Sequence, residues 1–250
     1  MRRPIMAANW KMHKNPSEAV AFAEQFLPLV RDADTVDIVL APPYIGLDRL
    51  AAAIAGSAVT LAAQNVHPEA KGAFTGEIAP GMLRDLGCAY AIVGHSERRT
   101  LFGEDSAFVS RKAAALLEAG MRPIVCVGET LEQREANQTF EVVGGQLEQS
   151  LADVAVGRAS EVVIAYEPVW AIGTGKTATP EMAQEVHAFA RERLAKRFGD
   201  AAGEIRIQYG GSVKPDNVAE LMAQPDIDGG LVGGASLEPE SFAKIVRFEG

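Results

Sequence analysis

Residues with acid-base or ionic side chains follow short apolar runs that lie far apart in the sequence. Asn9 lies near the end of the first run with Lys11 just after it, His95 ends another run, and Glu167 lies near the end of a third. A potential base, an imidazole and a cation are the groups that acid-base catalysis uses, provided that the fold brings them together. The first question is therefore which elements could position them on one face.

One stretch, residues 169–177 (VWAIGTGKT), ends like a nucleotide-binding loop. A P-loop needs a glycine five positions before its Gly-Lys-Thr, because the chain must fold closely round a phosphate. That position is Trp170, whose indole would fill the space meant for the phosphate. We therefore interpret the stretch as something other than an ATP-binding loop.

Eight short apolar runs recur along the chain and predict buried strands. Continuous apolar runs, in place of alternating ones, are typical of parallel strands that are covered on both faces by helices. The runs span residues 5–10, 36–42, 59–66, 90–95, 122–128, 162–168, 205–211 and 229–234.

The segments between these runs carry helix signals. We expect helices to begin near Ser17, near Glu104, and at Thr179 with its following Pro180. Eight strand-helix units without a linker favour the α/β class and a single closed (β/α)8 TIM barrel, with residues 1–250 as one domain. An open doubly wound sheet is the alternative, but its G-x-G-x-x-G is missing after the first strand.

Composition limits the kinds of partner. The 250-residue chain has a net charge of −9, which disfavours nucleic acid and anionic membrane surfaces. The two cysteines, Cys88 and Cys126, do not form the pattern of a disulfide-rich protein, and Cys126 lies inside an apolar run. No segment resembles a signal peptide or a membrane span. We expect a cytoplasmic protein with reduced thiols and, since no His pair has metal-ligand spacing, no metal site.

In a barrel of this type, chemistry is located at the carboxyl ends of the strands. Reading the residue that ends each run therefore gives the candidate site. The residues at these ends are Asn9, Lys11, His95, Ser96, Glu97, Glu167, Gly210, Gly211, Ser212, Gly233 and Gly234.

Five strings at these ends carry a family resemblance: AANWKM, GHSERR, AYEPVWAIGTGKT, QYGGSV and LVGGASL, in this order. The chain resembles the triosephosphate isomerase family over essentially its whole length, and that family is itself the standard example of this barrel. The resemblance implies interconversion of dihydroxyacetone phosphate and glyceraldehyde 3-phosphate through an enediolate, in glycolysis and gluconeogenesis, by a homodimer that needs no cofactor.

The resemblance also implies roles for the charged residues. Glu167 corresponds to the catalytic base, and His95 to a neutral imidazole that polarises the substrate carbonyl; the family is itself a standard example of this pair. Lys11 corresponds to the cation that stabilises the enediolate and attracts phosphate. Asn9 would fix the substrate oxygens, and Glu97 would support both Asn9 and Lys11.

Glycine-bearing turns and a lid complete the implied site. Gly173, Ser212, Gly233 and Gly234 would offer backbone N–H groups to the phosphate, along with Asn9 and Lys11, and a helix beginning at GGASL would add its positive end. The lid, which would fold over the ligand and exclude water, comprises Pro168, Val169, Trp170, Ala171, Ile172, Gly173, Thr174, Gly175, Lys176 and Thr177.

The long segment 65–80 resembles the dimer loop of the family, with Thr75 and Gly76 at the tip that contacts the neighbouring subunit. Ala79 stands where the family commonly has a capping Ser, and Pro80 at the first helical position compensates for the missing cap.

Two rival functions are another phosphate-binding barrel enzyme and a non-enzymatic scaffold. Asn9, Lys11, His95 and Glu167 in these strings argue against the first rival, and an intact acid-base set beside a lid argues against the second.

Overall fold

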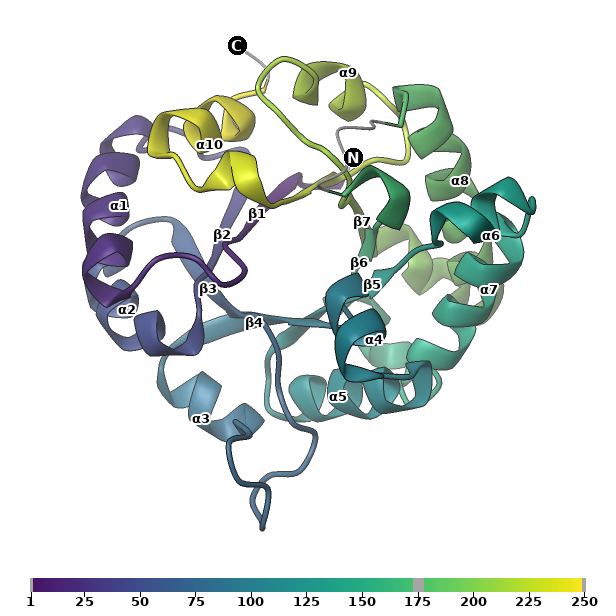
Figure 1. Cartoon of the computed structure of the whole chain (residues 1–250), viewed down its shortest axis with the longest axis horizontal. Coiled ribbons are helices and arrows are strands. Elements are labelled where there is room, and N and C mark those ends of the chain that lie inside the picture. Colours follow the sequence, from purple (N-terminus) through teal and green to yellow (C-terminus); the bar gives the residue numbers. More distant parts are fainter. Residues whose placement is uncertain (1, 173–177, 249–250) are drawn as a thin grey trace.

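The computed structural model describes residues 2–172 and 178–248. Within them, eight parallel strands form a closed barrel in chain order, because β1 pairs with both β2 and β8 (Figure 1). The predicted barrel is confirmed. The strands are β1 (Ile5–Asn9), β2 (Asp37–Ala41), β3 (Val59–Ala63), β4 (Cys88–Val93), β5 (Arg122–Val127), β6 (Val163–Tyr166), β7 (Arg206–Tyr209) and β8 (Gly229–Val232).

Helices surround the barrel and connect successive strands (Figure 1). They are α1 (Pro16–Leu29), α2 (Leu47–Ile54), α3 (Pro80–Asp85), α4 (Ser96–Phe102), α5 (Ser106–Glu118), α6 (Leu131–Glu135), α7 (Thr139–Ser150), α8 (Pro180–Phe198), α9 (Val218–Met222) and α10 (Pro239–Val246). Short 3₁₀ turns, among them η3 (Val169–Ala171) and η5 (Gly234–Ser236), follow strands at the rim.

The helix ends follow from local hydrogen bonding. Thr179 caps α8 by accepting from the Met182 N–H, as the sequence predicts. The helix expected near Glu104 begins two residues later, because Asp105 accepts from the Phe108 N–H and so becomes the cap of α5. Glu104 is buried instead, with its carboxylate against Lys112.

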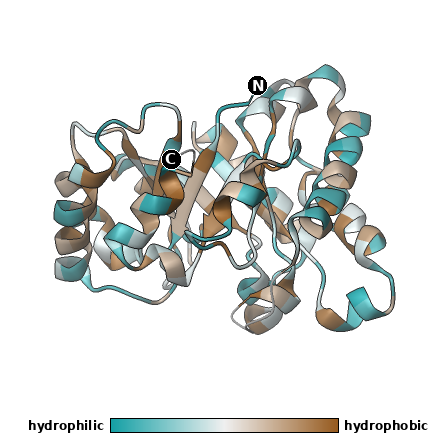
Figure 2. Cartoon of the chain, turned by 90° about the horizontal axis from the view of Figure 1, so that it is seen from above, coloured by the Kyte–Doolittle hydropathy of each residue, from teal (hydrophilic) through white to brown (hydrophobic). Residues whose placement is uncertain are grey.

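Two apolar layers explain why the strand sequences read as continuous apolar runs. One layer fills the barrel interior and includes Ala7, Ile92, Cys126 and Ala165; the other lies between the strands and the helices. Figure 2 shows the strands in the centre as mainly hydrophobic and places most hydrophilic residues on the outer helices and loops. Cys126 is fully buried inside the barrel, as predicted.

The segment between β3 and α3 projects from the ring of helices (Figure 1). The His67 N–H donates to the Ile78 carbonyl at its base, and the His67 ring packs against Phe74 at 4.1 Å between centroids. Ala79 offers no side-chain cap to α3, and Pro80 occupies the first helical turn, as the sequence predicts.

Candidate active site

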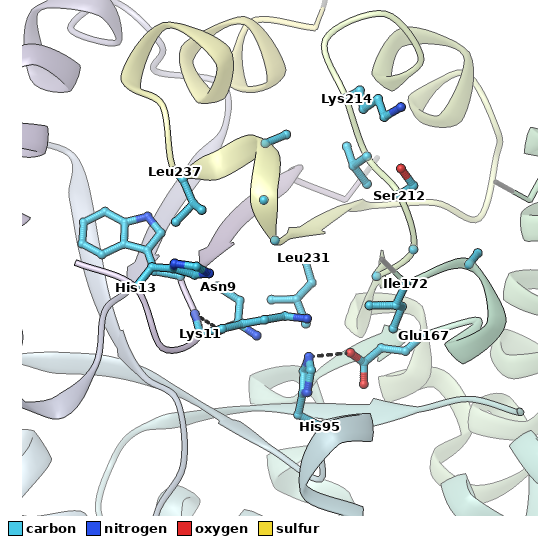
Figure 3. Close-up of a pocket in the computed structure, with 18 residues that line it drawn as sticks. Asn9, Lys11, His13, His95, Glu167, Ile172, Ser212, Lys214, Leu231 and Leu237 are labelled. Carbon is cyan, nitrogen blue, oxygen red and sulfur yellow. Dashed lines mark hydrogen bonds and ion pairs between the residues drawn. The ribbon is translucent and has the colours of Figure 1, made fainter. Parts of the chain in front are cut away.

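A cavity of about 310 Å³ opens at the carboxyl ends of the strands (Figure 3). Its walls come from residues that follow or end β1, β4, β6, β7 and β8, so the barrel brings together segments that are far apart in the sequence. The predicted site residues that line it are Asn9, Lys11, His95, Glu167, Ser212, Gly233 and Gly234.

Glu167 follows β6 directly and is 2% exposed. Its Oε1 lies 2.8 Å from Nε2 of His95, and its Oε2 accepts from the Ser96 N–H at 2.9 Å. Burial by itself disfavours the carboxylate. His95, the Ser96 N–H and Lys11 outweigh burial and hold the pKa of Glu167 below its ordinary value, so the group is a carboxylate at neutral pH.

His95 is the residue that caps the N-terminus of α4. Its Nδ1 accepts from the Glu97 N–H at 3.2 Å, which requires an unprotonated Nδ1 and places the proton of the neutral ring on Nε2. That Nε2–H faces Glu167. A sequence in which a helix begins directly after the imidazole therefore selects one tautomer and directs its donor into the cavity.

The contact between His95 and Glu167 determines the protonation of both groups. Burial lowers the pKa of His95, but the neighbouring carboxylate of Glu167 outweighs burial and raises that pKa. If the Glu167 carboxylate moved away, burial, Lys11 and the Glu97 N–H would favour the neutral imidazole, against the Glu97 carboxylate alone. The charge state of His95 is thus coupled to the position of Glu167.

Lys11 has an unusual backbone conformation, with φ of +50°, that two amide side chains hold. The side chain of Asn9 accepts from the Lys11 N–H at 3.1 Å, and Gln64 donates to the Lys11 carbonyl at 2.8 Å. Left-handed backbone at a non-glycine residue costs free energy and concentrates at functional sites. The Lys11 ammonium lies 2.6 Å from Glu97, which is itself outside the cavity wall.

The opposite wall is formed by backbone-rich turns. Ser212 follows β7, and Gly233 and Gly234 follow β8, with the Lys214 side chain nearby (Figure 3). The helix expected at GGASL is a three-residue 3₁₀ turn, η5, whose Ser236 carbonyl accepts from the Trp10 indole. This wall combines bare backbone with a cation, which suits an anionic group.

Comparison with known proteins agrees with this geometry. The family model described as triosephosphate isomerase matches residues 4–249. The chain belongs to the triosephosphate isomerase family. Curated proteins named triosephosphate isomerase are 55% identical in Endomicrobium trichonymphae, over 99% of both chains, and 56% identical in Herpetosiphon aurantiacus, over the full length of both. A third, from Moorella thermoacetica, is 55% identical over the full length of both. Family membership makes the chain an isomerase of triose phosphates.

The segment that resembles the lid of triosephosphate isomerases is described only in part. Pro168, Val169, Trp170, Ala171 and Ile172 form or flank η3, and Ala171 and Ile172 line the cavity. Gly173, Thr174, Gly175, Lys176 and Thr177 lie outside the described residues. The Trp170 indole donates to the carboxylate of Glu129 at 2.9 Å.

Two polar residues that support the site were not singled out from the sequence. Glu129 is fully buried and accepts from Trp170 and from the Tyr166 hydroxyl, so it joins the end of β6 to the first turn after Glu167. Its signal was available, because it closely follows the run 122–128. Gln64 left no such signal, since its role depends on the neighbouring β1 segment.

The residues predicted to contact a second subunit lie elsewhere. Thr75 and Gly76 are exposed at the tip of the projecting segment and do not line the cavity. Phe74 and Met12 are exposed by 44% and 94%. In the described part of the chain, no helix is long and apolar enough to cross a membrane, and no group of three His, Cys, Asp or Glu residues could hold a metal.

Proposed function

We propose that this triosephosphate isomerase interconverts dihydroxyacetone phosphate and glyceraldehyde 3-phosphate by proton transfer through an enediolate, with Glu167 as base. The observation that carries this proposal is the convergence of Asn9, Lys11, His95 and Glu167 on one cavity at the strand ends (Figure 3). The chain acts as a single domain, residues 1–250, without a cofactor.

Glu167 takes a proton from the carbon beside the substrate carbonyl. The electron pair of the broken C–H bond forms the C=C bond of the enediolate, and negative charge moves onto the carbonyl oxygen. The resulting carboxylic acid returns the proton to the former carbonyl carbon, and a proton moves from the hydroxyl oxygen to the former carbonyl oxygen, which completes the isomerisation and restores the carboxylate. Because both carboxylate oxygens have partners in the cavity wall, His95 and the Ser96 N–H, Glu167 has to release at least one of them to reach the substrate.

His95 donates from Nε2 to the substrate oxygens and moves protons between them. Once Glu167 turns to the substrate, the contact that raises the pKa of His95 is lost, and burial favours the neutral ring. A neutral donor suits this task, since it can give up its proton to the enediolate oxygen and take one back. Lys11 stabilises the negative charge, Asn9 orients the oxygens, and Glu97 holds the Lys11 ammonium.

The phosphate is bound by backbone N–H groups of Ser212, Gly233 and Gly234, with Gly173 from the lid. The net charge of −9 repels an anionic substrate at long range. The backbone donors and the Lys11 cation therefore supply the local attraction for the phosphate. Residues 168–177 close over the ligand and exclude water, which strengthens these electrostatic contacts.

The deciding experiment is an assay of the purified protein for triose phosphate interconversion, together with Glu167→Gln. We expect turnover by the wild type, and binding of inorganic phosphate without appreciable turnover by the variant. Folded wild-type protein that binds phosphate but shows no turnover would leave a non-enzymatic scaffold as the better account.

The active form is a homodimer in the cytoplasm that serves glycolysis and gluconeogenesis. The exposed segment around Thr75 and Gly76, with Phe74 and Met12 open to solvent, supports a subunit interface close to Lys11. Two copies related by a two-fold axis would each cover this surface on the other. Sedimentation at assay concentration tests the dimer, and a fully active monomer would refute it.

A further inference from the structure

Gly128, the first residue after β5, lies directly against the main chain of Glu167. A Cβ atom at Gly128 would be 1.7 Å from the Glu167 carbonyl oxygen and 2.6 Å from its carbonyl carbon. The Glu167 N–H also donates to the Val127 carbonyl at 2.7 Å. The backbone of Glu167 is therefore packed directly against Gly128, and a shift of Gly128 would shift Glu167 with it.

A single side chain binds both backbone polar groups of Gly128. The Gln146 Oε1 accepts from the Gly128 N–H at 2.8 Å, and the Gln146 Nε2 donates to the Gly128 carbonyl at 3.1 Å. This pair of bonds does what a neighbouring strand does in a sheet, one residue beyond the end of β5 at Val127. The sheet-like support thus continues to the level at which Glu167 leaves the barrel.

Gln146 comes from α7 and does not line the substrate cavity. It lines a separate cavity of about 110 Å³ that also touches Ser96, Gly128, Glu167 and Val169. Ser96 supplies the N–H that binds Glu167, and the Val169 N–H donates to the Glu129 carbonyl, next to Gly128. Gln146 therefore binds Gly128 beside the residues that hold the Glu167 carboxylate and the first turn of the lid segment.

We propose that Gln146 is a positioning residue for the isomerisation, which fixes Gly128 and through it the backbone of Glu167. The proposal rests on the role of Glu167 as base given under Proposed function. A displacement of about 1 Å at a reacting group can cost on the order of 100-fold in rate, so loss of this support is expected to show in turnover.

The cavity beside Gln146 makes the proposal testable without unfolding the protein. At about 110 Å³ it has room for water, which can satisfy the Gly128 N–H and carbonyl after truncation of the side chain. We expect Gln146→Ala and Gln146→Met to lower the unfolding midpoint by no more than about 4 °C. Methionine fills the space of the glutamine side chain but cannot replace its hydrogen bonds to the Gly128 N–H and carbonyl. The Met variant therefore distinguishes the effect of the hydrogen bonds from the effect of packing.

The test compares Gln146→Ala, Gln146→Met and the exposed matched control Gln149→Ala, which lies on the same helix. The Gln146 variants should lose roughly tenfold in kcat. Their inhibition by inorganic phosphate should be unchanged, and the acid limb of kcat/KM should move to higher pH, because a displaced Glu167 loses contacts that lower its pKa. Gln149→Ala should match the wild type in all three.

The proposal is overturned if the Gln146 variants keep wild-type kcat and the wild-type pH profile, or if Gln149→Ala loses as much activity. It is also overturned if the loss only follows the fraction of unfolded protein. Glu167→Gln separates this outcome from failure of the base assignment. Wild-type turnover by that variant removes Glu167 from the mechanism, whereas its inactivity beside active Gln146 variants removes only the positioning role.

Discussion

Alanine at Gly210 should displace the Glu167 side chain while the barrel stays folded. Gly210 follows β7, and a Cβ atom there would lie 2.9 Å from Cγ of Glu167 and 3.2 Å from the Tyr166 carbonyl oxygen. Ordinary contacts begin near 3.4 Å, so Cγ of Glu167 must move by about half an ångström, and the Tyr166 oxygen by much less. The Glu167 side chain moves more easily than the Tyr166 main chain.

The expected cost follows from this displacement. Gly210 is not among the glycines with positive φ, so its backbone accepts alanine without the strain that left-handed positions impose. A shift of half an ångström to one ångström at the base corresponds to a loss of roughly 10- to 100-fold in kcat. Inhibition by inorganic phosphate should weaken less than kcat falls, because Gly233 and Gly234 come from the turn after β8, whereas Ser212 shares the turn after β7 with Gly210.

The assay is steady-state triose phosphate interconversion by Gly210→Ala, with circular dichroism to check folding. Gly145→Ala is the matched control, because a Cβ at Gly145 meets nothing within 4 Å on the outer helix α7. It should keep full activity, and it should gain stability from the better helix propensity of alanine. Wild-type kcat from a folded Gly210→Ala variant would refute the claim that Glu167 needs this space.

Three further predictions concern single groups. Glu167→Gln should lower kcat by about 10²- to 10⁴-fold, and wild-type turnover would remove it from the mechanism. Lys11→Met should weaken inhibition by inorganic phosphate and reduce its salt dependence; unchanged values would exclude Lys11 from anion binding. Burial lowers the pKa of His187 to about 4, against 6.5 in the unfolded chain. The part of the unfolding free energy that depends on this shift, roughly 3 kcal/mol, is fully present above pH 6.5 and is lost as pH falls toward 4. Denaturation of His187→Gln against pH should show a shallower fall over that range, and an identical fall would contradict the assignment.

The sequence predicted the barrel because its strands are buried on both faces, which produces apolar runs that periodicity can detect. Strand ends then gave Asn9, Lys11, His95 and Glu167 as one group, since parallel strands present their carboxyl ends on one rim. Their convergence on one cavity is seen in the structure. Their catalytic roles stay predictions.

Contacts between elements that are not neighbours along the chain could not be predicted from the sequence. The bonds of Gln146 to Gly128 join α7 to the end of β5, and Gln64 reaches the Lys11 carbonyl from the end of β3. A glutamine in a helix or after a strand has no pattern that announces such a partner. The helix expected at GGASL is also a short 3₁₀ turn, in which the Ser236 hydroxyl donates to the Val232 and Gly233 carbonyls.

A crystal structure with a phosphorylated analogue of the enediolate tests the central claim most directly. We predict that the phosphoryl group lies against the backbone of Ser212, Gly233 and Gly234, and that the Glu167 carboxylate has left the Ser96 N–H to lie about 3 to 3.5 Å from the carbon that loses the proton. A phosphoryl group bound elsewhere, or a carboxylate still held by both His95 and the Ser96 N–H in the occupied site, would contradict the account.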